Sequence, residues 1–205
     1  MRPDAPRAGR AQASAGGVAG GRNARQPAAG ARMITWLPPT LLGASGRLGL
    51  AHSPGSRQRS RDDELDEFVA AGVQHVICLQ EAYEFSQRPL DETLDERRTA
   101  VETRGMRFTH EPIPDMAAPT LARTQRIVSA LGAELALGRS VVVHCWAGLG
   151  RAGTIAACAL IDAGHGPQLA VALLRDLRPG AVQSLLQERH VRQFADAVRA
   201  TRGGS

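Results

Sequence analysis

The apolar positions of this chain fall into short runs separated by longer amphipathic segments. We predict β-strands at five of the short runs, residues 34–37, 47–51, 73–79, 107–111 and 140–144. The runs 73–79 and 140–144 are largely apolar, which is typical of strands that are buried on both faces of a parallel sheet.

The segments between these runs carry apolar residues at helical spacing. We predict helices over residues 61–71, 91–104, 120–137, 154–163, 167–177 and 184–200, with a loop beginning at 81–85. Ser60 and Thr120 stand at expected N-caps, and Gly72 follows the end of the first helix. Strands that alternate with helices predict an α/β fold, with a mostly parallel central sheet of about five strands flanked by helices. In such folds the active site lies at the carboxyl ends of the strands.

Composition divides the chain at about residue 32. Residues 1–32 are rich in Ala, Gly and Arg, so we predict a disordered tail there and one domain over 33–200. The tail holds six arginines and one aspartate, which accounts for the whole net charge of +5. The high pI therefore does not indicate a nucleic-acid-binding domain. We interpret the tail as a solvated extension or a misplaced start codon in preference to a binding segment for acidic partners.

The cysteines and the hydropathy indicate the compartment. Cys78, Cys145 and Cys158 are odd in number and lack the pairing of metal ligands, so we expect neither a disulfide framework nor a metal site. No apolar run approaches the ~18 residues of a membrane helix, and the N-terminus lacks the apolar segment of a secretory signal. A reactive thiolate also needs a reducing environment. We expect a cytoplasmic protein with no membrane partner.

The last predicted strand leads into the segment HCWAGLGRAGT, residues 144–154. A loop with Gly148 and Gly150 before a helix start brings unpaired backbone N–H groups to one point, which is the geometry of an anion site. Cys145 opens the loop and Arg151 closes it, with five residues between them. The helix start and the guanidinium are expected to lower the pKa of the Cys145 thiol and make it a nucleophile toward phosphorus. Arg151 would bind two phosphate oxygens with its planar fork. The alternative for Cys145 is a buried structural cysteine.

The segment HCWAGLGR resembles the His-Cys, five residues, Arg signature of the cysteine-dependent protein phosphatases. The segments AAGVQHVICLQ, HEPIPDMAAPT and LRDLRPGAVQSLLQERHVRQF are most similar to the group of cyclin-dependent kinase inhibitor 3 phosphatases, and the likeness spans residues 36–198. The resemblance implies a protein tyrosine phosphatase-like fold of the dual-specificity type. It also implies hydrolysis of phosphoproteins through a phosphocysteine intermediate, with no cofactor. The phosphate would be bound by Trp146, Ala147, Gly148, Leu149, Gly150 and Arg151.

Cleavage of a phosphate ester also needs an acid that protonates the leaving oxygen. Asp115 is the candidate, since PIPD matches the loop that carries the acid in the resembled family. A turn-forming aspartate is the alternative, and Glu111 is a weaker candidate for the acid. The resemblance further implies that His144 hydrogen-bonds nearby backbone and helps to keep the cysteine ionised. It implies that Gln183 positions the hydrolytic water; a solvent contact at a helix start is the alternative.

One position departs from the family pattern. Ser or Thr usually follows the Arg and assists the thiolate when phosphocysteine is hydrolysed, but this chain has Ala152. Thr154 lies nearby and is expected to compensate only in part. A slow-turnover substrate-trapping module or a phosphate-binding pseudo-phosphatase therefore stays open as an alternative to an active enzyme.

The loop of residues 145–151, which we call the phosphate loop, also indicates the class of substrate. Residues 146–150 hold no basic side chain, whereas phosphoinositide phosphatases of this chemistry usually carry lysine there. We therefore expect a phosphorylated protein as substrate in preference to an inositol lipid. Dual specificity is expected because no tyrosine-recognition loop is visible, and we expect a monomer.

Overall fold

The computed structural model describes residues 33–203, so the disordered tail that we predict over residues 1–32 lies outside them. Its strands are β1 (Ile34–Trp36), β2 (Arg47–Ala51), β3 (His75–Cys78), β4 (Arg107–His110) and β5 (Ser140–His144). Its α-helices are α1 (Arg61–Ala70), α2 (Leu94–Glu102), α3 (Leu121–Ala136), α4 (Gly150–Asp162), α5 (Pro167–Leu177) and α6 (Leu185–Gly203). Short 3-10 helices are η1 (Pro39–Leu41) and η2 (Ala82–Ser86).

The described residues form a five-stranded sheet in the order β1-β2-β5-β3-β4. β1 pairs antiparallel with β2, and the other neighbours are parallel, which confirms the predicted mostly parallel sheet. β5 is the central strand. Its last residue, His144, is in register with Ala51 on β2 and with Cys78 on β3. The carboxyl ends of the parallel strands therefore meet at one edge of the sheet, where the predicted site begins.

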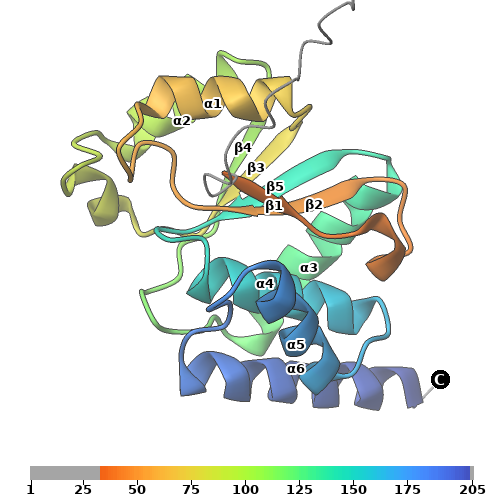
Figure 1. Ribbon diagram of the computed structural model, residues 1–205. Helices are drawn as coiled ribbons and strands as arrows, with labels where there is room; N and C mark the ends of the chain where they lie inside the picture. Colours follow the sequence, from red (N-terminus) through yellow and green to blue (C-terminus); the bar gives the residue numbers. More distant parts are fainter. Residues whose placement is uncertain (1–32, 204–205) are drawn as a thin grey trace, which may run out of the picture. The chain divides into compact units, whose positions relative to one another are not determined.

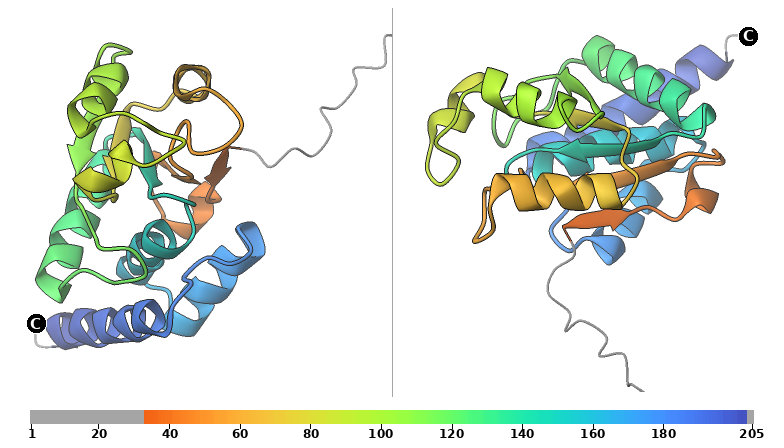
Figure 2. Two further views of the ribbon diagram at one scale, coloured as in Figure 1. Left: turned by 90° about the vertical axis from the view of Figure 1, so that its left-hand side faces the viewer. Right: turned by 90° about the horizontal axis from the view of Figure 1, so that it is seen from above.

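Helices cover both faces of the sheet. α1 and α2 lie on one face, and α3, α4, α5 and α6 lie on the other (Figure 1). Figure 2 shows from a second side that α6 lies far from α1 and α2. Strand residues alternate between the two cores, as the pleat requires: Val141 and Val143 pack with the layer that contains α4, and Val142 packs with the layer that contains α1. α4 contacts α3, α5 and α6 as well as the sheet, so it is buried along nearly its whole length.

The helix that follows the phosphate loop begins earlier than predicted. We expected it over 154–163, but α4 starts at Gly150 and includes Arg151 and Gly153. Glycine disfavours helix, which explains the error. Tertiary packing overrides this preference, because a β-carbon on Gly153 would lie 2.9 Å from the backbone nitrogen of Val182. Only glycine lets the two segments approach so closely.

Two predictions in the segment after β3 were also wrong in detail. The loop expected at 81–85 is the 3-10 helix η2, closed by a capping box between Glu81 and Glu84. The helix expected over 91–104 is shorter, because Thr93 and Glu96 form a capping box that starts α2 at Leu94. The other predicted elements are present with small shifts at their ends.

Candidate active site

The phosphate loop follows the central strand directly. β5 ends at His144, and Cys145 is the next residue, with 3% of its surface exposed. Gly148 has a φ of 71°, and a β-carbon on it would lie 2.2 Å from the carbonyl oxygen of Ala51. The tight turn therefore requires glycine at this position. α4 begins two residues later, so the expected order of strand, glycine loop and helix start is present.

The carbonyl groups of this loop are held by the surrounding scaffold. Ser53 N donates to Trp146 O over 3.0 Å, and Val182 N donates to Leu149 O over 3.2 Å. No backbone hydrogen bond within residues 33–203 uses the N–H groups of Ala147, Gly148, Leu149 or Gly150. A loop whose carbonyls point away and whose N–H groups are free can bind an anion.

Arg151 extends from the first turn of α4 and is only 1% exposed. Both of its terminal nitrogens donate to the carboxylate of Glu84, and Nη1 also donates to Ile113 O over 3.0 Å. Burial opposes the positive charge, but the hydrogen bonds to Glu84 and the charge of nearby Cys145 outweigh it and raise the pKa of Arg151 above its ordinary value. The guanidinium is thus permanently charged and fixed in orientation.

The sequence pattern does not indicate Glu84, whose segment we predicted to be a loop. Its side chain is 6% exposed, and it lies on η2, far from Arg151 in the sequence. The available signal was the spacing of Glu81 and Glu84, which is a capping-box pattern. That pattern predicts local structure, and nothing in it indicates the distant arginine.

Asp115 reaches the site from the loop between β4 and α3. Its Oδ1 lies 3.2 Å from Nη2 of Arg151, and its side chain is 64% exposed. The base of the loop is anchored, since Ile113 N donates to Leu79 O over 3.0 Å. Glu111, the weaker candidate, accepts two hydrogen bonds from Arg123 at 2.9 and 2.8 Å instead. The structure therefore brings Asp115, and not Glu111, to the arginine of the phosphate loop.

His144 is completely buried behind the nucleophile. Its Nδ1 lies 3.4 Å from the carbonyl oxygen of Cys145, and its Nε2 has no hydrogen-bond partner in the described part of the chain. Burial lowers the pKa of His144 to about 3, so the ring is neutral. This placement agrees with the expected backbone contact and gives His144 no role as a base.

The other two cysteines differ from Cys145. Burial raises the pKa of the Cys78 thiol to about 12 and raises that of Cys158 above its ordinary value, so both remain protonated. All three cysteines are free of disulfides. Cys145 alone among them opens the phosphate loop.

Neither Ala152 nor Thr154 presents a free hydroxyl to a departing thiolate in this structure. Ala152 is fully buried and offers no polar group. The hydroxyl of Thr154 donates to Gly150 O over 2.8 Å, inside the helix. The Thr154 hydroxyl is thus already engaged, and its partial compensation for Ala152 stays a prediction.

Two glutamines lie against the helix start. A β-carbon on Gly150 would lie 2.8 Å from Oε1 of Gln183 and 2.9 Å from Nε2 of Gln187. Gln183 is thus at the phosphate loop, as expected for a residue that contacts the hydrolytic water. The sequence reasoning did not single out Gln187, which is fully buried.

Arg178 is a second buried arginine at the loop that the sequence reasoning missed. Its Nη2 donates to Ala147 O over 3.1 Å, and its Nη1 donates to the hydroxyl of Thr35 over 2.9 Å. Within residues 33–203 no carboxylate pairs with it. Burial lowers the pKa of Arg178 relative to its ordinary value, with a smaller contribution from Arg57. Arg178 therefore links the phosphate loop, at Ala147 O, to strand β1, at Thr35.

No group of three or more His, Cys, Asp or Glu side chains in the described residues is arranged to hold a metal ion. No helix of residues 33–203 has both the length and the apolarity that crossing a membrane requires.

Comparisons with known proteins agree with this geometry. Residues 51–191 match the family model described as a Swiss Army Knife protein, DSP-PTPase phosphatase domain. Cyclin-dependent kinase inhibitor 3 of Sus scrofa is 33% identical over 174 residues, which cover 82% of this chain and 80% of that protein. The human protein of the same name is 30% identical over 174 residues with the same coverage. The solved structure of kinase associated phosphatase, with its catalytic cysteine replaced by serine, is 29% identical with a TM-score of 0.73, covering 82% of this chain and 96% of that one.

Proposed function

The chain belongs to the family of dual-specificity and tyrosine phosphatase domains, and from this premise we propose that Cys145 removes phosphate from proteins through a phosphocysteine. The phosphatase domain in this proposal spans residues 33–200. The observation that carries it is that Cys145 opens a loop in which four successive backbone N–H groups have no partner among the described residues, and that it interacts with the fixed guanidinium of Arg151.

The first step transfers the phosphoryl group to the enzyme. The Cys145 thiolate attacks phosphorus while the bond to the leaving oxygen breaks, and Asp115 in its acid form gives its proton to that oxygen. The loop N–H groups stabilise the charge on the three remaining phosphate oxygens, together with the two donors of Arg151 that remain: Nε, which has no hydrogen-bond partner in the described residues, and the second N–H of Nη2. The proximity of Asp115 to Arg151 supports this assignment.

The second step restores the enzyme. Water attacks phosphorus, the S–P bond breaks, and the Asp115 carboxylate takes the proton of the water. Gln183 is the residue that we assign to orienting the water, and its contact with Gly150 supports this role. The thiolate leaves without a hydroxyl at position 152, so this step is the slow one in our proposal. Ala152 also favours the second candidate, a substrate-trapping module with very slow turnover.

A phosphorylated protein is the substrate that we propose. The absence of basic side chains at 146–150 supports it, and so does the name of the solved relative, kinase associated phosphatase. We further propose a monomer of dual specificity that works in the reducing cytoplasm without nucleic-acid or membrane partners.

Hydrolysis of p-nitrophenyl phosphate by the wild type and by Cys145→Ser tests the mechanism. The variant should lose turnover but still bind inorganic phosphate, because the loop N–H groups and Arg151 are unchanged. Substantial hydrolysis by Cys145→Ser would refute the role of the nucleophile. A panel of phosphopeptides and phosphoinositides then tests the substrate class, and preference for the lipids would contradict it.

A further inference from the structure

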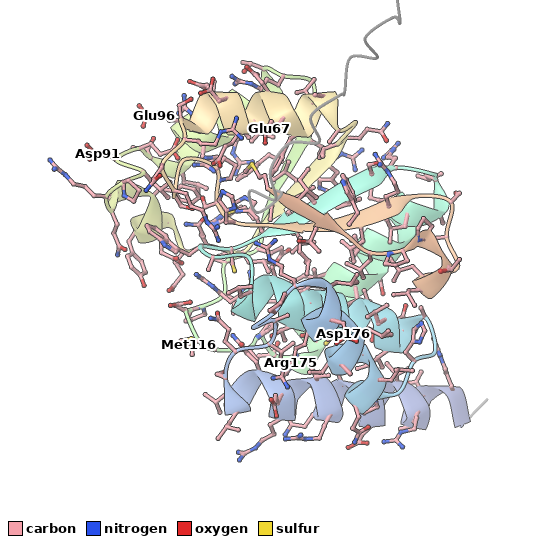
Figure 3. The ribbon with its side chains drawn as sticks, in the orientation of Figure 1. Glu67, Asp91, Glu96, Met116, Arg175 and Asp176 are labelled. Atoms are coloured by element: carbon pink, nitrogen blue, oxygen red, sulfur yellow. The ribbon has the colours of Figure 1, made fainter. Side chains whose placement is uncertain are left out.

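Two loops that flank the phosphate loop contain residues in an unfavourable backbone conformation. Met116, next to Asp115, has a φ of 59°, and Val182, next to Gln183, has a φ of 57°. Met116 is labelled in Figure 3 on the loop that approaches the start of α6. Left-handed backbone is uncommon for residues other than glycine and is rarest for β-branched ones, so surrounding contacts must hold it.

Gln187 supplies contacts to both loops through one amide group. Its Oε1 accepts from the backbone nitrogens of Gln183 and Ser184 over 2.9 and 3.2 Å. Its Nε2 donates to the carbonyl oxygen of Ala117 over 3.1 Å. The partners are two donors and one acceptor, so the orientation of the amide is fixed by the hydrogen bonds themselves. The side chain is fully buried.

A second link joins the same two loops. The hydroxyl of Ser184 donates to Met116 O over 2.8 Å and accepts from the backbone nitrogen of Gln187 over 3.2 Å. The loop between β4 and α3 that carries Asp115, which we call the acid loop, is therefore bound at two successive carbonyl groups, those of Met116 and Ala117. One bond comes from Ser184, next to Gln183, and the other from Gln187 in the first turn of α6.

The Gln187 amide also lies against the phosphate loop. A β-carbon on Gly150 would lie 2.9 Å from its Nε2 and 3.1 Å from its Oε1. Three segments, far apart in the sequence, thus meet at one side chain: the start of α4, the acid loop and the turn with Gln183.

We propose that Gln187 is a positioning residue. It holds the acid Asp115 and the water-orienting Gln183 in fixed positions relative to each other and to the phosphate loop. This inference rests on the proposed function. Asp115 acts when the leaving group departs, and Asp115 and Gln183 act together when water attacks. One amide that fixes both loops therefore controls both chemical steps without contacting the substrate.

Gln187→Met tests this role, because methionine keeps the volume of the side chain and removes its three hydrogen bonds. We expect kcat/KM to fall by about 10–100-fold for alkyl phosphates, which need the acid, since a displacement near 1 Å costs this much. The fall should be much smaller for aryl phosphates whose leaving group needs no proton. The steady rate after the first turnover should also fall. Competitive inhibition by inorganic phosphate should remain within about threefold of the wild type, because Arg151 and the loop N–H groups are not hydrogen-bonded to Gln187.

Gln193→Met is the matched control, since it makes the same chemical change at an exposed position of the same helix. It should behave as the wild type in every assay. If Gln187→Met fails to fold, Ser184→Ala tests the same link, because it removes the hydrogen bond to Met116 O, and its rate loss should again be larger for alkyl than for aryl phosphates.

The results separate this inference from the function on which it rests. Equal losses for all leaving groups, or a loss of phosphate affinity as large as the loss of rate, would overturn it and leave Gln187 as a packing residue. Wild-type rates in the Gln187 variant would overturn it as well. In each case an active wild type and an inactive Cys145→Ser would leave the proposed function standing.

Discussion

Replacing Glu84 by glutamine removes the charge that faces Arg151. In the wild type both terminal nitrogens of Arg151 donate to the carboxylate of Glu84, and the two side chains are 1% and 6% exposed. The amide of glutamine would present an N–H group to a guanidinium N–H, and no solvent reaches the pair to replace the lost acceptor. Glu81 N, which donates to Oε1 of Glu84 over 2.8 Å, loses part of its partner as well.

The structure sets the size of the effect. Removing one partner of a buried ion pair costs about 3–5 kcal/mol, because the remaining charge loses its buried counter-charge; the carboxylate of Asp115, 64% exposed and 3.2 Å from Nη2, is the acidic partner that remains. At about 2–4 °C per kcal/mol for a domain of this size, the melting temperature should fall by about 6–20 °C. The rate should fall too, since an unsupported Arg151 loses its orientation toward phosphate.

Thermal unfolding with and without inorganic phosphate measures both consequences. A phosphate dianion supplies negative charge beside Arg151, so one fixed concentration of inorganic phosphate should raise the melting temperature of the variant by more than that of the wild type. Glu102→Gln is the control, because Glu102 pairs with Arg98 at 3.9 Å on the surface, where an ion pair contributes at most about 1 kcal/mol. A Glu84→Gln protein as stable as this control would refute the view that the buried pair orients the arginine.

Three further substitutions address the chemistry. Arg151→Lys keeps the charge but loses the planar fork, so steady-state kinetics should show a higher KM and a kcat lower by roughly 10²–10³-fold; unchanged constants would remove Arg151 from the site. Asp115→Asn should cost roughly 10²–10⁴-fold with poor leaving groups and less when the leaving group needs no proton, and a uniform loss would indicate a structural role of the loop. Ala152→Ser should raise the steady rate while leaving a stoichiometric burst of product, seen by rapid mixing, nearly unchanged. A wild-type time course without a burst would mean that hydrolysis of phosphocysteine is not the slow step.

The fold was predictable where local pattern and tertiary packing agree. β5 is a continuous apolar strand because it is buried on both faces, and the start of α3 follows from the cap at Thr120, whose side chain accepts from Arg123 N. The prediction was wrong where packing overrides propensity. The first turn of α4 contains glycines, which disfavour helix. Glycine is required there because the turn of residues 181–184 packs closely against this part of α4, and that turn lies some thirty residues away in the sequence.

The site residues also fall into those that a local sequence pattern predicts and those that only the fold brings together. Cys145 and Arg151 lie at the two ends of one loop, so their spacing in the sequence predicts that the two side chains face the same anion site. Glu84, Arg178 and Gln187 reach that loop from three other elements, and no local pattern indicates their contacts. Asp115 was predictable only in part. The sequence predicts the loop that carries it, but its proximity to Arg151 depends on the fold.

The burial of α4 has a consequence for how the enzyme opens. The helix that carries Arg151 is enclosed by the sheet and three other helices, so its amide protons beyond the first turn can exchange with solvent only when the core itself unfolds. The tip of the loop that carries Asp115, residues 114–116, is exposed and needs only its few hydrogen bonds to break. We therefore expect small fluctuations to produce a species whose phosphate loop is intact and whose acid is displaced. Such a species holds phosphate but does not turn over alkyl substrates, so loss of the acid loop separates binding from catalysis long before the domain melts.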